Sequence, residues 1–413
     1  MSQIRNIQLL LVLSGILLLA GCQNDSAEPA GGKQETMVNL IPITTNYVDA
    51  QRMGTRADTY DPPTGYVPYD SLYPTTLPPH RTIGVFLTPE KQNSLGNFIY
   101  QGKDSTGTSF WQSTVYVTTG TIYYIYGYMP REDSETATIS PKDGNYANGA
   151  TLNINNYTTL TSADVCAIVG VRNASEEEKT SHVLHSPLNL GFFTYEGQSE
   201  GNNNIFVLLK HIYAGIHIKA FIGEKYHKMR DIEITRLRLQ AKNIPDYVNL
   251  TLDLTANSTG ADPLNATYQL ATTMGTQIVE LFPYEGSTSY RVMEESDDPN
   301  PEGFLGCFVP GPPASDPTHP LTFEIETRYN VYDRVMEMEN GAPVLEDGKP
   351  KYINHLIREG CVARNKIDPS KIPGFAEIQA GDVFTVNLII EPDYLYQLSD
   401  PDLDNPTIIT TTP

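Results

Sequence analysis

The stretch IFVLLKHIYAGIHI at residues 205–218 decides how this chain can fold. It opens with five consecutive apolar residues, and an apolar run of that length is typical of a strand covered on both faces. Because side chains alternate along a strand, the run predicts two buried sets on opposite faces: Ile205, Val207 and Leu209 on one, and Phe206 and Leu208 on the other.

Similar β-prone runs continue on both sides of this stretch. The chain has 30 prolines, 31 glycines and 25 tyrosines, which favours many strands joined by turns. The runs before it are residues 38–44, 82–88, 114–118, 121–128, 151–155 and 165–171, and those after it are 214–222, 231–240, 248–254, 276–282, 303–309, 321–327, 331–338 and 382–390. The best helix candidates are the acidic run 176–178 and YINHLIRE at 352–359. We expect an all-β, mainly antiparallel sandwich with few short helices.

Two of these runs carry more detail. Ile232, Ile234, Leu237 and Leu239 begin with a period of two and shift phase at Thr235-Arg236, which predicts a β-bulge. Tyrosines at 123, 124, 126 and 128 predict a strand with aromatic side chains on both faces.

The expected organisation has two domains, because about 390 residues exceed the usual size of one core. The polar stretch EGQSEGNNN at 196–204 marks the boundary, between an N-terminal β-sandwich at 37–195 and a C-terminal one at 205–413. Pro42 cannot donate to a sheet ladder, so we expect it in a strand at a sheet edge or at the end of its strand.

The N-terminus has the pattern of an export signal. Arg5 precedes a short apolar run that ends in Leu-Ala-Gly-Cys22, a sequence similar to the bacterial lipobox. We expect residues 1–21 to be removed, Cys22 to carry acyl chains, and residues 22–36 to form a flexible tether. The rest of the sequence offers no apolar stretch long enough to span a membrane.

The net charge excludes one class of partner. With 28 Lys and Arg against 49 Asp and Glu, the formal charge is -21. This charge would repel phosphate backbones, so we expect no nucleic-acid binding.

The search for chemistry gives weak candidates. Ser199 lies in a G-x-S-x-G pattern, but the helix that a nucleophile elbow needs does not follow it. The remaining candidates lack a third ligand or a closing residue for a metal site: His182 and His185, His211 and His217, and the acidic turn of Asp400, Asp402 and Asp404. Cys166, Cys307 and Cys361 allow at most one disulfide, and Cys166 is expected in the core. We expect no enzyme activity, no cofactor and no metal.

Three parts of the sequence together resemble the fimbrillin family, the lipoprotein subunits of type V pili. The first is the order of lipobox, tether, first strand and Thr55-Arg56-Ala57. The second is the 205–218 stretch with its central His211, and the third combines CFVP at 307–310, LTFEIE at 321–326 and AGDVFTVNL at 380–388.

The resemblance implies two transthyretin-like sandwich domains in a subunit of a fimbrium at the cell outer membrane, anchored by lipid and exposed at the cell surface. It also implies assembly with other pilus subunits by strand exchange, and a role in cell adhesion toward a host or bacterial surface receptor. Cleavage after Arg56 would release the first strand, and the segment 393–413 would serve as the donor strand.

A second function class remains open from the residues alone. Tyrosines and the single Trp111 could stack on sugar rings in a surface glycan-binding lipoprotein, although the same aromatics could serve as core packing. Detergent-resistant polymers favour the pilus subunit, whereas saturable binding of a polysaccharide by the monomer favours the second reading.

We predict that Cys22→Ala abolishes lipidation, because the thiol is the acceptor of the acyl chains. Metabolic labelling with a clickable fatty acid should mark the wild-type chain and leave the variant unmarked. Label on the variant would show that the anchor lies elsewhere.

Overall fold

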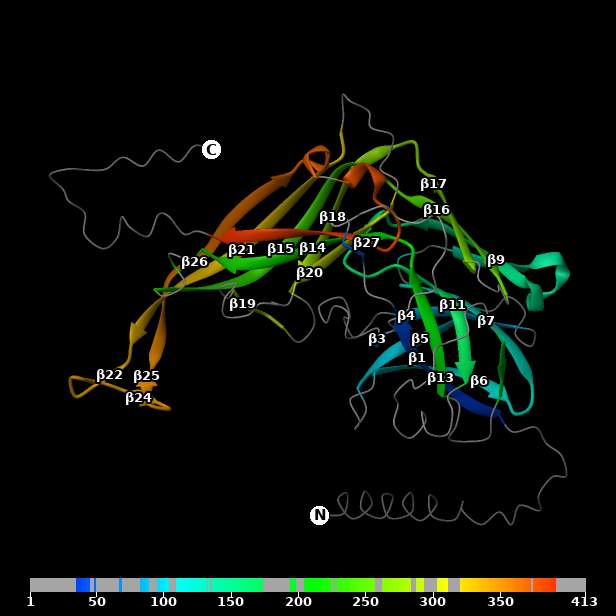
Figure 1. The fold of residues 1–413 in the computed structure, drawn as a ribbon, viewed down its shortest axis with the longest axis horizontal. Helices are drawn as coiled ribbons and strands as arrows, with labels where there is room; N and C mark the ends of the chain where they lie inside the picture. The colour runs from blue at the N-terminus through cyan, green and yellow to red at the C-terminus, as the bar shows by residue number, and fades with distance from the viewer. Residues whose placement is uncertain are drawn as a thin grey trace, which may run out of the picture.

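The computed structural model describes the chain between residues 35 and 390 with gaps. The described ranges are 35–44, 48–49, 67–68, 82–88, 95–103, 109–131, 133, 136–173, 194–197, 204–223, 226, 229–256, 262–283, 287–292, 303–310, 320–372 and 374–390. Most of these residues belong to strands arranged in four main sheets, as predicted for an all-β chain (Figure 1).

The first sheet closes on itself. Its order is β11 (Cys166–Asn173), β13 (Asn204–His211), β1 (Glu35–Thr44), β6 (Ser109–Thr118), β5 (Leu95–Lys103), β4 (Thr82–Thr88), β7 (Ile122–Met129) and β12 (Thr194–Glu196), with β3 (Val67–Pro68) paired to β1. Because β11 also pairs with β7, the strands from β11 to β7 form a complete circuit. Its inner face holds a core that includes Phe98 and Trp111, both fully buried.

A second sheet covers part of the outer face of the first. It contains β17 (Leu264–Leu270), β16 (Val248–Thr255), β9 (Gly149–Tyr157) and β8 (Thr136–Pro141), in that order. Leu152 and Leu252 from this sheet share a core with Tyr126 and Phe206 from the first. The two sheets therefore pack as layers that join residues far apart in sequence.

The other two sheets form a sandwich. One contains β10 (Leu160–Thr161), β20 (Phe304–Phe308), β14 (Ala214–Ile222), β27 (Asp382–Ile390) and β2 (Val48–Asp49). The other contains β18 (Met274–Phe282), β15 (Arg230–Pro245), β21 (Thr322–Met336) and β26 (Tyr352–Ile367), with β19 (Tyr290–Val292) paired to β15. Between them lies a cluster of aromatic rings whose centroids are 5.4–6.3 Å apart: Phe308, Phe323, Phe375 and Phe384.

The remaining described elements are short. Two small hairpins, β22 (Met338–Glu339) with β23 (Ala342–Pro343) and β24 (Leu345–Glu346) with β25 (Lys349–Pro350), connect β21 to β26. Four single-turn 3₁₀ helices are η3 (Lys142–Gly144), η4 (Tyr146–Asn148), η5 (Pro369–Lys371) and η6 (Phe375–Glu377).

The predictions for β13 and β15 are confirmed. Ile205, Val207 and Leu209 face the inner core of the closed sheet, and Phe206 and Leu208 face the core shared with the second sheet. The register of β15 against β21 shifts between Ile234 and Arg236, where the phase change predicts a bulge.

The strand β7 also matches its prediction. Tyr123 lies in the inner core, whereas Tyr126 and Tyr128 lie in the core shared with the second sheet and Tyr124 packs against it. Cys166 is fully buried, as expected.

The helix predicted at 352–359 is wrong. These residues open β26, and Leu356 pairs with Tyr332 of β21. The spacing of the apolar residues suits a helix, but pairing with a long neighbouring strand overrides a local preference of eight residues. The runs 321–327 and 331–338 are likewise one strand, β21, with register shifts near Tyr329 and Val331.

Of the two positions expected from Pro42, the sheet edge is wrong, whereas Pro42 does lie near the end of β1, two residues before Thr44. Strand β1 lies between β13 and β6. Pro42 is tolerated because the antiparallel pairing on that side is interrupted there: Leu40 pairs with Trp111 of β6, and pairing resumes at Ile43 with Pro68 of β3.

The division expected at 195/205 does not coincide with a division between sheets. Strand β13 follows it in sequence but pairs in parallel with β1 and in antiparallel with β11. The second sheet likewise combines β8 and β9 with β16 and β17. The physical reason is the two-sided apolar surface of β13, which requires a strand on each side and a layer on each face.

We predict that Phe206→Ala destabilises the protein by about 3–5 kcal/mol, because removal of a large aromatic ring that is only 1% exposed leaves a cavity in the core. Chemical denaturation measures the change. The control is Ile278→Ala, whose side chain is on the surface at 60% exposure and should change stability by less than about 0.5 kcal/mol. An unchanged melting temperature for Phe206→Ala would contradict the packing described here.

Candidate functional site

Strand β1 occupies a slot in the closed sheet. Its pairing with β6 runs from Glu35 to Leu40, and its pairing with β13 runs from Asn39 to Ile43. Val38 and Leu40 are fully buried in the inner core, whereas Ile41 and Ile43 enter the core shared with the second sheet. The slot therefore offers two rows of backbone groups for hydrogen bonding and apolar pockets on both faces.

A long hairpin extends from the sandwich and is called the arm here, residues 331–358. It consists of the end of β21, the small hairpins β22 to β25, and the start of β26, and Figure 1 shows it projecting from the body of the molecule. Strand β26 is the edge of its sheet. Large apolar side chains on the arm are 37–61% exposed: Val335, Met338, Leu345, Tyr352, Ile353, Leu356 and Ile357. Exposed apolar side chains gathered at a sheet edge are a common feature of surfaces that contact other proteins.

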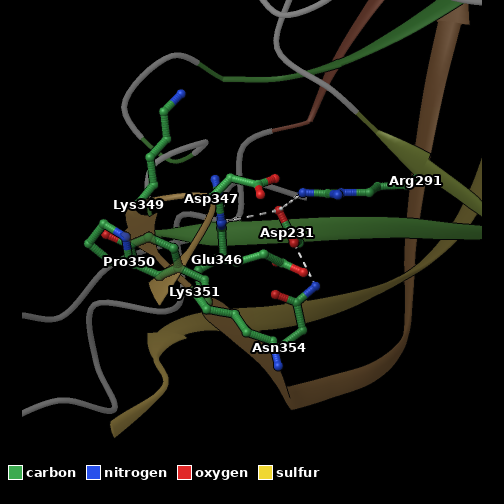
Figure 2. A pocket seen from close by; sticks show the side chains of 10 residues that line it. Asp231, Arg291, Glu346, Asp347, Lys349, Pro350, Lys351 and Asn354 are labelled. Carbon is green, nitrogen blue, oxygen red and sulfur yellow. Dashed lines mark hydrogen bonds and ion pairs between the residues drawn. The ribbon is translucent and has the colours of Figure 1, made fainter. Parts of the chain in front are cut away.

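A pocket lies at the base of the arm, with Asp231 of β15 at its centre (Figure 2). Its volume is about 570 Å³. One carboxylate oxygen of Asp231 accepts a hydrogen bond of 3.1 Å from Arg291 and lies 3.8 Å from the Arg334 guanidinium. The other accepts a 2.6 Å hydrogen bond from the Asn354 amide.

The chemistry of this pocket suits a polar, uncharged ligand better than an anion. Both arginines already share the Asp231 carboxylate. The rim adds charges of both signs, from Glu346, Asp347, Lys349 and Lys351. Arg334 also lies 5.4 Å from the centre of the Tyr352 ring. An amide, a tyrosine and mixed charges can donate to and accept from many hydroxyl groups, as sugars require.

Most site residues expected from the sequence lie outside the described residues. These are Cys22, Arg56, His182, His185, Ser199, Asp400, Asp402, Asp404 and the segment 393–413. Trp111 is described and is fully buried, with its ring centroid 4.8 Å from that of Tyr100. The suggestion that Trp111 stacks on sugars is therefore wrong.

The structure brings together Cys166 and His211, which the sequence analysis treated separately, and Asp164, which it did not single out. Cys166 pairs with His211 in the register of β11 and β13, and Asp164 lies just before β11. All three side chains are buried. The grouping cannot be seen in the sequence, because Cys166 and His211 are 45 positions apart and meet only when β11 pairs with β13. The alternation of residues in the two strands could have indicated it only if their register were known.

His217 of β14 is half-buried and lies against Gly303, where a Cβ would be only 1.7 Å from Nε2. Burial, and to a lesser extent the charge of Lys219, lowers the pKa of His217 to about 4. The imidazole is therefore neutral at physiological pH.

Comparison with known proteins gives fimbrial and cell adhesion proteins of Bacteroides. No protein-family profile matches the chain, and none of the curated proteins matches it. Similar solved structures include one from Bacteroides fragilis named as a cell adhesion protein, with 11% identity, a TM-score of 0.34, and coverage of 86% of this chain and 93% of that chain. A fimbrial protein of Bacteroides vulgatus shows 9% identity, a TM-score of 0.27, and coverage of 86% and 95%.

A further structure, from Bacteroides uniformis and also named for cell adhesion, has 10% identity, a TM-score of 0.28, and coverage of 80% and 98%. The TM-scores of all three structures are below 0.5 and describe a loose superposition. Among the described helices, none has the length and hydrophobicity to cross a bilayer.

We predict that His217 makes the protein less stable in acid. The unfolded chain binds a proton at His217 near the usual value of about 6.5, whereas the folded chain binds it only near pH 4. The stabilising contribution of neutral His217 is therefore fully present above pH 6.5. It is lost as the pH falls from 6.5 to 4, which lowers the free energy of unfolding by on the order of 3 kcal/mol. His217→Gln should flatten this part of the curve in urea denaturation at a series of pH values.

The control for this prediction is His355→Gln, because His355 is exposed on β26. That variant should keep the pH dependence of the wild type. The same slope in wild type and His217→Gln would show that His217 does not carry the effect.

Proposed function

We propose that this chain is a structural subunit, or an anchor or tip component, of a type V pilus that is assembled by strand exchange and serves cell adhesion. The single observation that carries the proposal is the position of β1, an N-terminal strand held between two neighbours in an otherwise continuous sheet. The resemblance of the sequence to fimbrillins supports the proposal, because it implies that the first strand is the one exchanged between subunits.

Removal of β1 would leave a groove made for another strand. Strands β6 and β13 would each present unpaired backbone groups. The pockets now filled by Val38 and Leu40 would open on one side, and those of Ile41 and Ile43 on the other. Main-chain hydrogen bonds would give affinity, and the alternate pockets would select a donor with alternating apolar residues.

The donor proposed is the segment 393–413 of another subunit, which ends in the β-prone sequence Thr407-Ile408-Ile409-Thr410. Arg56, on the link that follows β1 and β2, is the proposed cleavage site. Cleavage there would free β1 together with the lipid anchor on Cys22. Head-to-tail insertion whose rotation does not close into a ring would yield a filament on repetition.

The arm supports a second contact between subunits. Its exposed apolar side chains and the free edge of β26 would lie against a neighbouring subunit or a receptor at the cell surface. The proposed location is the outer membrane, with the lipid anchor on Cys22 and the protein facing outward.

A second candidate function is glycan binding in the pocket of Figure 2. The observation that favours it is the combination of the half-exposed Tyr352 ring with Asn354 and the rim charges. Saturable polysaccharide binding by the monomer, lost in Tyr352→Ala, would support this function, which is compatible with a tip subunit.

We predict that Arg56→Ala and deletion of 393–413 each prevent incorporation into filaments, because the first blocks opening of the groove and the second removes the donor strand. The measurement is the ladder of detergent-resistant polymers from the cell surface, combined with N-terminal sequencing of the surface protein. Arg52→Ala is the matched control, since it changes a nearby arginine outside the proposed cleavage site.

Unchanged melting temperatures of the purified variants would show that their monomers fold normally. Normal incorporation of both variants would contradict strand exchange. A mature chain that keeps its lipid anchor and remains at the base of the filament would identify the anchor subunit.

A further inference from the structure

Three side chains that can each bind a metal ion meet in the core, where β11, β13 and the end of β1 come together. Asp164 is 1% exposed, Cys166 is fully buried and His211 is 4% exposed. Nδ1 of His211 lies 2.8 and 3.0 Å from the two carboxylate oxygens of Asp164 and 3.5 Å from Sγ of Cys166. One ligand atom from each residue lies within 4.8 Å of the others.

We propose that Asp164, Cys166 and His211 bind one divalent transition-metal ion of the zinc class, and that Thr44 of β1 orients the imidazole. Carboxylate, thiolate and imidazole are the ligands that Zn²⁺ and Co²⁺ take in proteins. A nitrogen and a sulfur bound to one ion at tetrahedral angles are about 3.5 Å apart, given bond lengths of about 2.1 and 2.3 Å. The Nδ1 to Sγ distance already has this value.

The carboxylate needs only a small movement. A bound oxygen and nitrogen would be about 3.4 Å apart, against the observed 2.8–3.0 Å. The difference of about half an ångström is within the reach of a rotation of the Asp164 side chain, and it replaces a hydrogen bond by two bonds to the ion.

Charge balance favours an ion in this buried place. A divalent ion displaces the proton of the Cys166 thiol, and its two positive charges are balanced by one thiolate and one carboxylate. The filled site is then neutral as a whole, which avoids the cost of a buried net charge.

Thr44 prepares the histidine for this role. Its hydroxyl donates a 3.1 Å hydrogen bond to the Leu209 carbonyl. The Thr44 oxygen also lies 3.4 Å from Nε2 of His211. Without an ion, the 2.8–3.0 Å contacts with the Asp164 carboxylate require the ring proton on Nδ1. When an ion binds Nδ1, the ring carries its proton on Nε2 instead, and the Thr44 oxygen, whose own proton goes to the carbonyl, accepts from Nε2–H.

A surface cavity lies against the histidine of the cluster. It has a volume of about 370 Å³, and His211 forms part of its wall together with Lys210, Ile212, Tyr268, Pro310 and Gln379. Water from this cavity, or the second oxygen of Asp164, would complete four ligands. Binding would join β11, β13 and the last residue of β1, and so hold the first strand in its slot.

The test uses the full chain, purified in detergent without a histidine tag and stripped with a chelator. Titration with Co²⁺ should produce a thiolate-to-cobalt charge-transfer absorption band that saturates at one ion per chain and is displaced by Zn²⁺. Cys166→Ser should abolish the band. Cys307→Ser, which changes another fully buried cysteine outside the cluster, should retain it. Thr44→Val should weaken binding by about 10–100-fold.

If a variant is less stable, metal binding can still be tested by comparing its melting temperature in chelator with that in Zn²⁺. Zn²⁺ should raise the melting temperature of the wild type and of Cys307→Ser, and leave that of Cys166→Ser unchanged. Absence of the cobalt band in a folded wild-type chain would overturn the proposal, as would a band that persists in Cys166→Ser. The cluster would then be a hydrogen-bonded junction between strands.

Discussion

The burial of β13 on both faces is the constraint on which the rest of the structure depends. A strand whose alternate side chains are all large and apolar has no face that can meet water, so one layer must cover each side. The closed sheet provides the first layer by curving around the inner core, and the sheet of β9 and β16 provides the second. Because β13 also needs a partner on each edge, it draws β1 and β11 beside it, although both come earlier in the chain.

Strand β1 pairs with β13 and also contributes side chains to both cores. Its apolar residues belong to both cores, its two edges are paired, and its last residue, Thr44, contacts the buried His211. A strand so placed contributes much to the stability of the sheet, and its loss would expose apolar surface in two directions at once. The contacts of Thr44 lie at the end of β1 nearest the buried His211, so they bear directly on how firmly this strand is held.

Local features could be predicted from the sequence, but the pairing of strands that are far apart in the chain could not. Strands β4, β14 and β27 begin and end where their apolar runs do, and the phase change at Thr235-Arg236 indicated the bulge in β15. The interior position of β1 could not be predicted from Pro42, because it depends on where pairing with β6 ends. Residues 352–359 have helical spacing and are strand because β21 lies beside them. The Asp164, Cys166 and His211 cluster likewise depends on the register of two strands, which no local pattern encodes.

The pairing of β1 on both edges has a mechanical consequence. A pull on the chain ahead of Glu35 acts along the axis of β1, in the direction in which the strand would slide past its neighbours. Its hydrogen bonds to β6 and β13 lie across that direction, so they share the load and must yield together. The same bonds would break one after another if the strand were peeled away sideways. The first strand therefore resists tension applied along its axis, in shear, far better than it resists unzipping from one end.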